Sequence, residues 1–140
     1  MRSKVILLVD DDPEDKLIIQ DAMEVLESGD VMRFADDGQH AWRILEESNE
    51  KDSIPCLIVL DLNMPKLNGA QTLERIKNDS RFKNIPVIIF STSINPLEKE
   101  RCLILGAHAY VVKPVSFKES IETAKTFLAF CRSEIPVQES

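Results

Sequence analysis

Short, uninterrupted apolar runs are the feature that most constrains the fold of this chain. Three of them, VILLV at 5–9, CLIVL at 56–60 and VIIF at 87–90, contain no polar residue. A strand with one face in water alternates apolar and polar residues, so unbroken runs this short indicate strands buried on both faces. Two weaker runs, VMRFA at 31–35 and YVV at 110–112, complete a predicted set of five strands.

Amphipathic segments separate these runs. Apolar residues at helical spacing predict helices over 14–28, 41–47, 70–78, 96–105 and 117–131. Strands that alternate with helices fold, through right-handed crossovers, into a parallel sheet covered on both faces. The predicted fold class is therefore α/β, with a five-stranded parallel sheet.

Some details of these helices can also be predicted. The inward face of the first helix is expected to carry Ile18, Ala22, Val25 and Leu26. The last helix is expected to place Phe117, Ile121, Ala124 and Leu128 inward, with Phe127 and Phe130 outside that register. Gly106 follows the fourth helix and is the expected glycine after its C-cap.

Composition limits the class of protein. The 140 residues suit one domain, which we place at 1–133, followed by a frayed tail at 134–140. The net charge of −7 argues against nucleic acid as a partner, and no basic run suits a membrane surface. The N-terminal apolar stretch is too short for a signal peptide or a membrane span. Cys56, Cys102 and Cys131 are odd in number and widely spaced, which predicts reduced core thiols in a cytoplasmic protein.

Polar residues follow every predicted strand. Asp36 and Asp37, after the outer strand at 31–35, are interpreted as turn and capping residues. The polar residues after the other four strands form a separate set. They are Asp10, Asp11 and Asp12 after the first, Asp61 after the third, Ser91 and Thr92 after the fourth, and Lys113 after the fifth. The carboxyl ends of parallel strands meet at one edge of the sheet, where such folds bind their ligands. The sequence therefore predicts a pocket that holds several carboxylates, a hydroxyl group and one ammonium group.

Clustered carboxylates need a counter-charge. Two unit charges about 4 Å apart repel by about 4 kcal/mol at an effective dielectric constant near 20, and one lysine cannot neutralise three acids. Mg²⁺ binds one or two carboxylates together with water and phosphate oxygens, and it fits this set. Single residues also have structural explanations: Asp12 before Pro13 is a predicted N-cap, and Asp15 favours the dipole of the first helical turn. His40 and His108 are interpreted as structural.

Four motifs together resemble the receiver domain of response regulators, of the kind found in chemotaxis regulators. LLVDDD is similar to the acidic pair, LDLNMPKLNG to the phospho-acceptor loop, PVIIFSTS to the switch strand and GAHAYVVKP to the lysine segment. The resemblance covers residues 4 to about 130. DDDPED and FSTSIN are most similar to single-domain regulators of phytochrome-type histidine kinases. The implied fold is a flavodoxin-like, doubly wound (βα)5 sheet with strand order 2-1-3-4-5.

The resemblance also implies residue roles. Asp61 is the implied phospho-acceptor. The implied Mg²⁺ ligands are Asp11, Asp10 through water, Asp61 and the backbone carbonyl of Asn63. Ser91, Lys113 and Tyr110 are implied to bind phosphate or to act in the switch. The implied partner is a sensor histidine kinase or a phosphotransfer protein in a two-component phosphorelay. The implied activity is phosphoryl acceptance with at most slow self-dephosphorylation, not that of an enzyme. Ser stands at 91 where Thr is common, and Lys99 and Glu100 lie where apolar residues are expected.

Other functions remain open at this point. Asp10 and Asp12 form the Asp-x-Asp of a haloacid-dehalogenase-like phosphatase, but no acidic Gly-Asp loop follows Lys113. A flavodoxin-like cofactor binder would carry a Ser-, Thr- or Gly-rich loop after the first strand, where this chain is acidic. A protein-interaction domain that is not phosphorylated is a third alternative.

The surface of the receiver is expected to carry the signal, because no effector segment follows residue 133. The run CLIL at 102–105 places apolar residues on more than one face of the fourth helix. We therefore expect a symmetric homodimer through the fourth helix, the fifth strand and the fifth helix.

Overall fold

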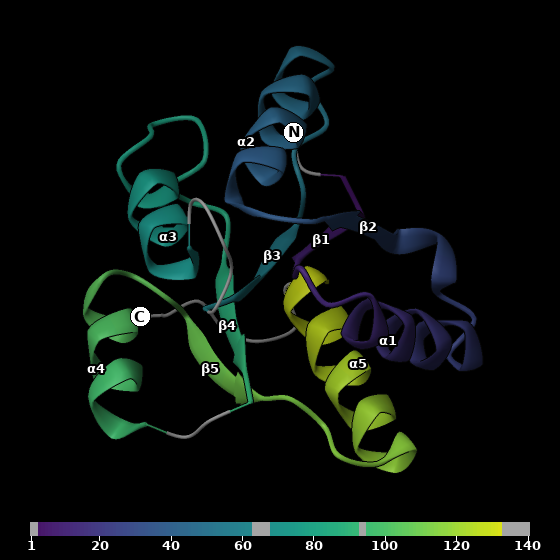
Figure 1. Ribbon diagram of the computed structural model, residues 1–140. Coiled ribbons are helices and arrows are strands. Elements are labelled where there is room, and N and C mark those ends of the chain that lie inside the picture. Colours follow the sequence, from purple (N-terminus) through teal and green to yellow (C-terminus); the bar gives the residue numbers. More distant parts are fainter. Residues whose placement is uncertain (1–2, 63–67, 93–94, 133–140) are drawn as a thin grey trace.

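Helices and strands alternate through the parts of the chain that the computed structural model describes, residues 3–62, 68–92 and 95–132 (Figure 1). The strands are β1 (Ile6–Val9), β2 (Met32–Ala35), β3 (Leu57–Asp61), β4 (Val87–Ser91) and β5 (Ala109–Val112). The α-helices are α1 (Pro13–Val25), α2 (Gly38–Glu50), α3 (Gly69–Lys77), α4 (Pro96–Ile104) and α5 (Phe117–Cys131), and a 3₁₀ turn, η1, spans Gly29–Val31. Each predicted element is present, with ends that differ by a few residues.

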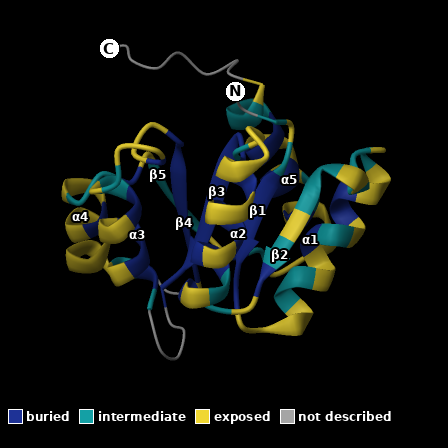
Figure 2. Cartoon of the chain, turned by 90° about the horizontal axis from the view of Figure 1, so that it is seen from above, coloured by how far each residue is buried: buried dark blue, intermediate teal, exposed yellow. Residues whose placement is uncertain are grey.

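The strands form one parallel sheet in the order β2-β1-β3-β4-β5. This confirms the predicted flavodoxin-like, doubly wound α/β fold. The three unbroken apolar runs became β1, β3 and β4, whose residues are all buried, and Figure 2 shows these strands as a dark layer between the helices. The mixed run became β2 at one edge, where only Ala35 is buried.

Alternate strand residues supply two cores, one on each face of the sheet. On one face, Leu7 and Val9 pack with buried residues of α2, α3 and α4. On the other face, Ile6 and Leu8 pack with buried residues of α1 and α5. The period of two along a strand assigns successive side chains to opposite cores, which is why β1 has no polar position.

Two predicted helix ends are confirmed. Asp12 is the N-cap of α1, where its side chain accepts a hydrogen bond from the N–H of Glu14. Gly106 has a φ of +112° after the C-cap of α4. The N–H of Ala107 donates to the carbonyl of Cys102, and that of Gly106 to the carbonyl of Leu103, which is the Schellman pattern.

Two predicted helix faces are partly wrong. In α1 the buried residues are Ile19, Ala22 and Met23, whereas Ile18 and Val25 are exposed. In α5, Phe127 is fully buried with its ring edge-on to that of Phe90, and Phe117 is exposed. Both helices are apolar over a wide arc, so spacing alone left their rotation about the helix axis undetermined. Packing of α1 against α5 selected the buried side.

The cysteine prediction is wrong for two residues. Cys56, which precedes β3, and Cys131, which ends α5, form a disulfide with their Cα atoms 5.0 Å apart. Cys102 is a free, buried thiol, as predicted. The 75-residue separation hides the pairing in the sequence, because only the fold brings the start of β3 beside the end of α5.

The predicted tail at 134–140 lies outside the described residues, so the boundary at 133 stays a prediction. None of the helices in the described parts of the chain has both the length and the apolar character needed to cross a bilayer.

Candidate functional site

Three carboxylates gather where β1 and β3 end. These strands are neighbours, with Val9 paired to Leu60, so the residues that follow them emerge side by side. One carboxylate oxygen from each of Asp10, Asp11 and Asp61 lies within 4.8 Å of the others. Asp10 and Asp61 are buried, whereas Asp11 is exposed. The structure thus assembles the predicted acidic cluster.

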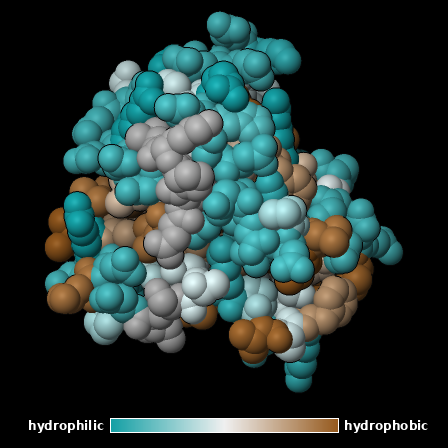
Figure 3. Space-filling model, in the orientation of Figure 1, coloured by the Kyte–Doolittle hydropathy of each residue, from teal (hydrophilic) through white to brown (hydrophobic). Residues whose placement is uncertain are grey.

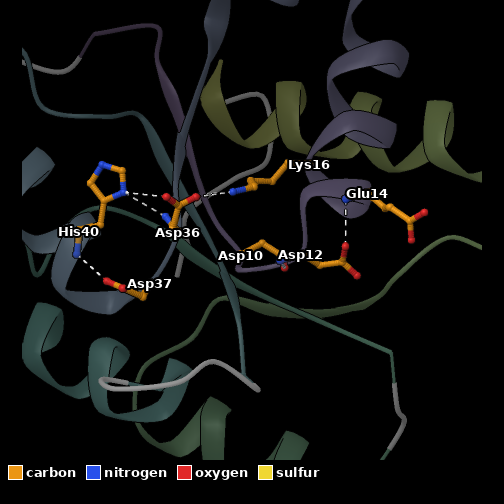
Figure 4. A network of polar contacts seen from close by, with 7 residues as sticks. All are labelled: Asp10, Asp12, Glu14, Lys16, Asp36, Asp37 and His40. Atoms are coloured by element: carbon orange, nitrogen blue, oxygen red, sulfur yellow. Dashed lines mark hydrogen bonds and ion pairs between the residues drawn. The ribbon is translucent and has the colours of Figure 1, made fainter.

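The three consecutive aspartates after β1 do different things. The N–H of Asp10 donates to the carbonyl of Ala35 at 3.0 Å and so extends the pairing of β1 with β2. Its Oδ1 accepts the N–H of Asp12 at 2.9 Å, and Asp12 in turn caps α1 through Glu14 (Figure 4). Asp11 is left to face solvent at the cluster. Asp10 therefore anchors the loop, Asp11 faces solvent and Asp12 starts α1.

Asp36 and Asp37, which follow β2, belong to a separate polar group (Figure 4). Asp36 pairs with Lys16, and its N–H donates to Nδ1 of His40 at 3.1 Å. Asp37 caps α2 by accepting the N–H of His40. These contacts agree with the structural interpretation of His40 and of both aspartates.

Lys113 lies among the carboxylates, immediately after β5. Its Nζ is 2.9 Å from Oδ2 of Asp10, 3.5 Å from Oδ2 of Asp61 and 2.6 Å from Oδ2 of Asp15. The side chain is only 8% exposed, and Nζ lies 5.6 Å from the centre of the Phe90 ring. A buried ammonium group of this kind needs counter-charges around it, and here three carboxylates supply them.

Burial and charge shift the pKa values of this pair in ways that have clear causes. Burial raises the pKa of Asp10 to about 6, against the lowering effects of the Asp12 N–H and of Lys113. Burial alone would lower the pKa of Lys113, but the neighbouring carboxylates of Asp15 and Asp10 outweigh it and raise that pKa. Lys113 therefore stays an ammonium group, while Asp10 holds a charge that its surroundings only partly stabilise.

The residues present fit a divalent cation. Oδ2 of Asp10 is buried and, among the described residues, receives no well-directed hydrogen bond, so its 2.9 Å contact with Lys113 is an ion pair alone. A buried, unsatisfied carboxylate oxygen beside two further carboxylates is a donor set for a hard cation. The predicted ligand Asn63 lies outside the described residues.

Ser91 and Tyr110 lie on one face of the sheet. Ser91 ends β4 and is fully buried, two residues beyond Ile89, which belongs to the core beneath α2, α3 and α4. Tyr110 pairs with Ile89 and packs, partly buried, against the same core. Since strand side chains alternate, the hydroxyl of Ser91 and the ring of Tyr110 point to the same side.

Sequence reasoning missed Gly69, the first residue of α3. A Cβ atom on Gly69 would lie 2.3 Å from the carbonyl oxygen of Asp61 and 2.7 Å from Cα of Leu62. The start of α3 is thus packed directly against the backbone of Asp61. In the sequence this glycine is only the last residue of LDLNMPKLNG, and its place beside the end of β3 gives it this role.

Asp15 was the other omission. It was predicted to favour the helix dipole, but its side chain makes the shortest contact to Lys113. Asp15 and Lys113 are 98 positions apart in the sequence, so no local pattern links them. The only signal available was that Asp15 lies one helical turn after the aspartates.

Comparison with known proteins settles the family. Residues 6–125 match the family model described as the response regulator receiver domain. The chain belongs to this family. Receiver domains are typically phosphoryl acceptors without enzymatic turnover, supplied by histidine kinases or phosphotransfer proteins of two-component systems.

Individual relatives resemble this receiver domain over nearly their whole length. Chemotaxis protein CheY1 of Helicobacter pylori (strain ATCC 700392 / 26695) is 32% identical over 120 residues, which cover 84% of this chain and 93% of CheY1. Response regulator Rcp1 of Synechocystis sp. (strain ATCC 27184 / PCC 6803 / Kazusa) is 30% identical over 129 residues, 91% of this chain and 88% of Rcp1. The receiver domain is therefore of the CheY and Rcp1 type.

Solved structures agree. The phosphorylated cyanobacterial phytochrome response regulator RcpA superposes with a TM-score of 0.83 and 31% identity, covering 98% of this chain and 99% of RcpA. The Mn²⁺-bound form of Rcp1 gives a TM-score of 0.76 and 29% identity, covering 94% and 96%. These matches confirm the predicted resemblance to phytochrome response regulators.

Proposed function

We propose that Asp61 of this receiver domain accepts a phosphoryl group from the phosphohistidine of a histidine kinase or a phosphotransfer protein. The observation that carries the proposal is the position of Asp61. It ends the central strand β3, it lies in the carboxylate cluster with Asp10 and Asp11, and its Oδ2 is 3.5 Å from Nζ of Lys113.

The chemistry follows from these groups. A carboxylate oxygen of Asp61 forms a bond to phosphorus while the bond from phosphorus to the donor imidazole nitrogen breaks, and the electron pair returns to that nitrogen. Such transfers depend mainly on positioning and on neutralising charge. Lys113 supplies an ammonium group for one phosphoryl oxygen, and Gly69 allows α3 to brace the backbone of Asp61.

We infer that Mg²⁺ is the cofactor and that Asp10, Asp11, Asp61 and the backbone carbonyl of Asn63 hold it. When bound, Mg²⁺ would neutralise part of the charge on the carboxylates and on the transferred phosphoryl group. The buried, unsatisfied oxygen of Asp10 supports this inference. Mn²⁺ binding is reported for the related Rcp1.

We propose Ser91 and Tyr110 as the switch pair. A phosphoryl group on Asp61 offers new acceptor oxygens, toward which the hydroxyl of Ser91 can turn. Tyr110 packs on the same side of the sheet and can follow into the space that is released. This is a shift between two packings of β4 and α4, the kind of transition that a local charge can bias.

Labelling with acetyl phosphate in the presence of Mg²⁺ tests the acceptor. Asp61→Asn should abolish the phosphoryl mass increment while thermal unfolding shows that the fold persists. Asp21→Asn, a matched charge change on the exposed side of α1, should label like the wild type. Full labelling of Asp61→Asn at another residue would overturn the assignment.

The same protein distinguishes a phosphoryl acceptor from a phosphatase. We propose at most slow self-dephosphorylation, because Asn63 replaces the second acid that a haloacid-dehalogenase-like enzyme needs. Stoichiometric labelling without turnover of p-nitrophenyl phosphate is the expected result. Repeated turnover would favour the phosphatase.

We propose a phytochrome-type histidine kinase as the donor, because RcpA, described as a phytochrome response regulator, matches 98% of this chain. Incubation with a panel of phosphorylated kinases tests this through the relative transfer rates. Faster transfer from a kinase of another class would show that the donor is not a phytochrome-type kinase. We also propose a cytoplasmic location, which cell fractionation tests.

We also propose a symmetric homodimer through α4, β5 and α5, strengthened by phosphorylation. Large apolar side chains are exposed on these elements and on the loop between β5 and α5: Leu97, Leu103, Ile104, Val112, Val115 and Phe117. Figure 3 shows apolar surface over α4, where Pro96, Lys99, Glu100, Leu103 and Ile104 also line a surface pocket. Phe127, which was predicted to lie outside the inward register of α5, is buried and does not contribute. A contiguous apolar patch marks an interaction site more often than chance exposure does.

Sedimentation with and without beryllofluoride, a phosphate mimic, tests the dimer. Leu103→Glu should prevent association, whereas Leu17→Glu, at an exposed leucine on α1, should not. A protein that stays monomeric in both states would leave binding to a different protein as the output.

A further inference from the structure

The closest partner of Lys113 is neither the proposed acceptor nor a proposed metal ligand. Asp15, the third residue of α1, accepts a hydrogen bond from Nζ at 2.6 Å, compared with 2.9 Å to Asp10 and 3.5 Å to Asp61. An ammonium group has three N–H donors. Three carboxylates therefore surround Lys113 before any phosphoryl group arrives.

A phosphoryl group on Asp61 would add further acceptor oxygens and negative charge at this point. One of the existing contacts must then lengthen. Asp10 is fully buried, and its Oδ1 accepts a hydrogen bond from the N–H of Asp12. Asp15 is different because its side chain is 21% exposed, so water can solvate the carboxylate once it is released.

We propose that Asp15 competes with the phosphoryl group for Lys113 and so sets how tightly the pocket holds phosphate. The inference rests on the proposed function of Asp61. Asp15 is a positioning residue, since it acts through Lys113 and touches neither phosphate nor metal. In the unphosphorylated state it holds the ammonium group, and in the phosphorylated state it is the contact that yields.

The alternative is that Asp15 has a purely structural role. In that case its contact with Lys113 would only link α1 to the segment after β5, and its removal would make Lys113 less well positioned and weaken phosphate binding. The two roles predict changes of opposite sign, so the affinity for a phosphate mimic discriminates between them.

Titration of beryllofluoride at a fixed, saturating Mg²⁺ concentration tests the proposal, with the NMR signals of Tyr110 as the readout. Tyr110 is the only tyrosine in the chain, so its signals are unambiguous. Asp15→Asn should bind the mimic roughly threefold to tenfold more tightly, because a charge that opposes it has gone. Glu14→Gln removes a charge from the neighbouring, exposed position and should change the affinity less than about twofold, since solvent and salt screen exposed charges.

Two further variants separate positioning from folding. Asp15→Glu keeps the charge and should restore an affinity near that of the wild type. In a Lys113→Met background the effect of Asp15→Asn should shrink to that of Glu14→Gln. If Asp15→Asn does not fold, Asp15→Ser takes its place in both comparisons.

A measurement without metal or mimic checks the contact itself. Thermal unfolding in EDTA of the wild type, Asp15→Asn, Lys113→Met and the double variant should give non-additive changes, as expected for side chains in contact. Additive changes, or weaker or unchanged mimic binding in Asp15→Asn, would overturn the proposal. Acetyl phosphate labelling of the same variants keeps the two proposals apart: loss of the Asp61 assignment shows as label on another residue, whereas failure of this inference leaves label on Asp61.

Discussion

The backbone N–H of Lys113 donates a hydrogen bond to the carbonyl oxygen of Ser91 at 2.7 Å. This bond continues the pairing of β4 with β5 by one residue beyond Ser91 and Val112. The proposed switch residue and the phosphate-binding lysine are therefore joined through the main chain. This connection between the end of β4 and the lysine involves no intervening side chain.

Ser91→Ala should separate phosphorylation from switching. The main-chain bond to Lys113 does not need the hydroxyl, so acetyl phosphate should still label Asp61. The response of Tyr110 should be lost or greatly reduced, because the hydroxyl that turns toward the phosphoryl group is missing. NMR spectra of the single tyrosine with and without beryllofluoride measure this. Ser91→Thr keeps a hydroxyl and serves as the control, and a full Tyr110 response in Ser91→Ala would contradict the switch assignment.

Gly69→Ala should destabilise the fold and disturb the acceptor. The added Cβ would lie 2.3 Å from the carbonyl oxygen of Asp61, and backbone atoms there cannot move independently. Overpacking of this kind costs about 1–3 kcal/mol of unfolding free energy. Chemical denaturation measures the loss, and slower labelling of Asp61 should accompany it.

Gly29→Ala is the matched control for that variant. Its Cβ would meet Cγ of Glu24 at 2.8 Å and Nε2 of Gln20 at 3.0 Å, which are parts of flexible side chains that can move away. The expected cost is below about 1 kcal/mol. Equal losses at the two glycines would show that the contact with Asp61 has no special importance.

Asp10 should make the metal-free protein less stable as the pH rises. Burial raises its folded-state pKa from 3.8 to about 6. Between these values the folded protein holds a proton that the unfolded chain releases, so the unfolding free energy falls with rising pH and levels off above pH 6. The contribution is on the order of 2–3 kcal/mol.

Denaturation in EDTA at a series of pH values, on the wild type and Asp10→Asn, isolates this contribution. Asn cannot ionise, so the stability of Asp10→Asn relative to the wild type should increase across the same window. A constant difference between the two proteins from pH 4 to 7 would show that Asp10 titrates normally.

Asp11→Ala should weaken Mg²⁺ binding, by roughly tenfold or more, because the exposed carboxylate of the cluster is lost. The metal-free protein should become slightly more stable, since repulsion with Asp10 and Asp61 is relieved. Calorimetric titration and thermal unfolding in EDTA provide the two measurements. Asp21→Ala, on the exposed side of α1, should leave both unchanged, and an unaltered Mg²⁺ affinity in Asp11→Ala would remove Asp11 from the ligand set.

Much of the fold was predictable because burial leaves a direct mark on the sequence. The runs around Leu7, Leu57 and Ile88 had no polar residue and became strands buried on both faces. The rotation of α1 was not predictable, since Ile18 and Ile19 are equally apolar and only contact with α5 decides between them. The disulfide was missed because neither Cys56 nor Cys131 carries a local signal.

The candidate site was likewise predictable only in part. Asp10, Asp61 and Lys113 each follow an apolar strand directly, so the topology alone predicted that they would meet. Asp15 lies within a helix, and Gly69 is important because it has no Cβ atom. Both depend on distances between elements, which a linear pattern does not contain.

The disulfide between Cys56 and Cys131 closes the second half of the molecule into a covalent ring that contains β3, α3, β4, α4, β5 and α5. The first half is an arm with a free end, although its strand β1 lies inside the sheet between β2 and β3. A protease cut at Lys77 or Arg101 falls within the ring, so the oxidised fragments stay joined and migrate together until a reducing agent is added. A cut at Arg33 falls in the arm and releases its fragment under either condition once the protein is denatured.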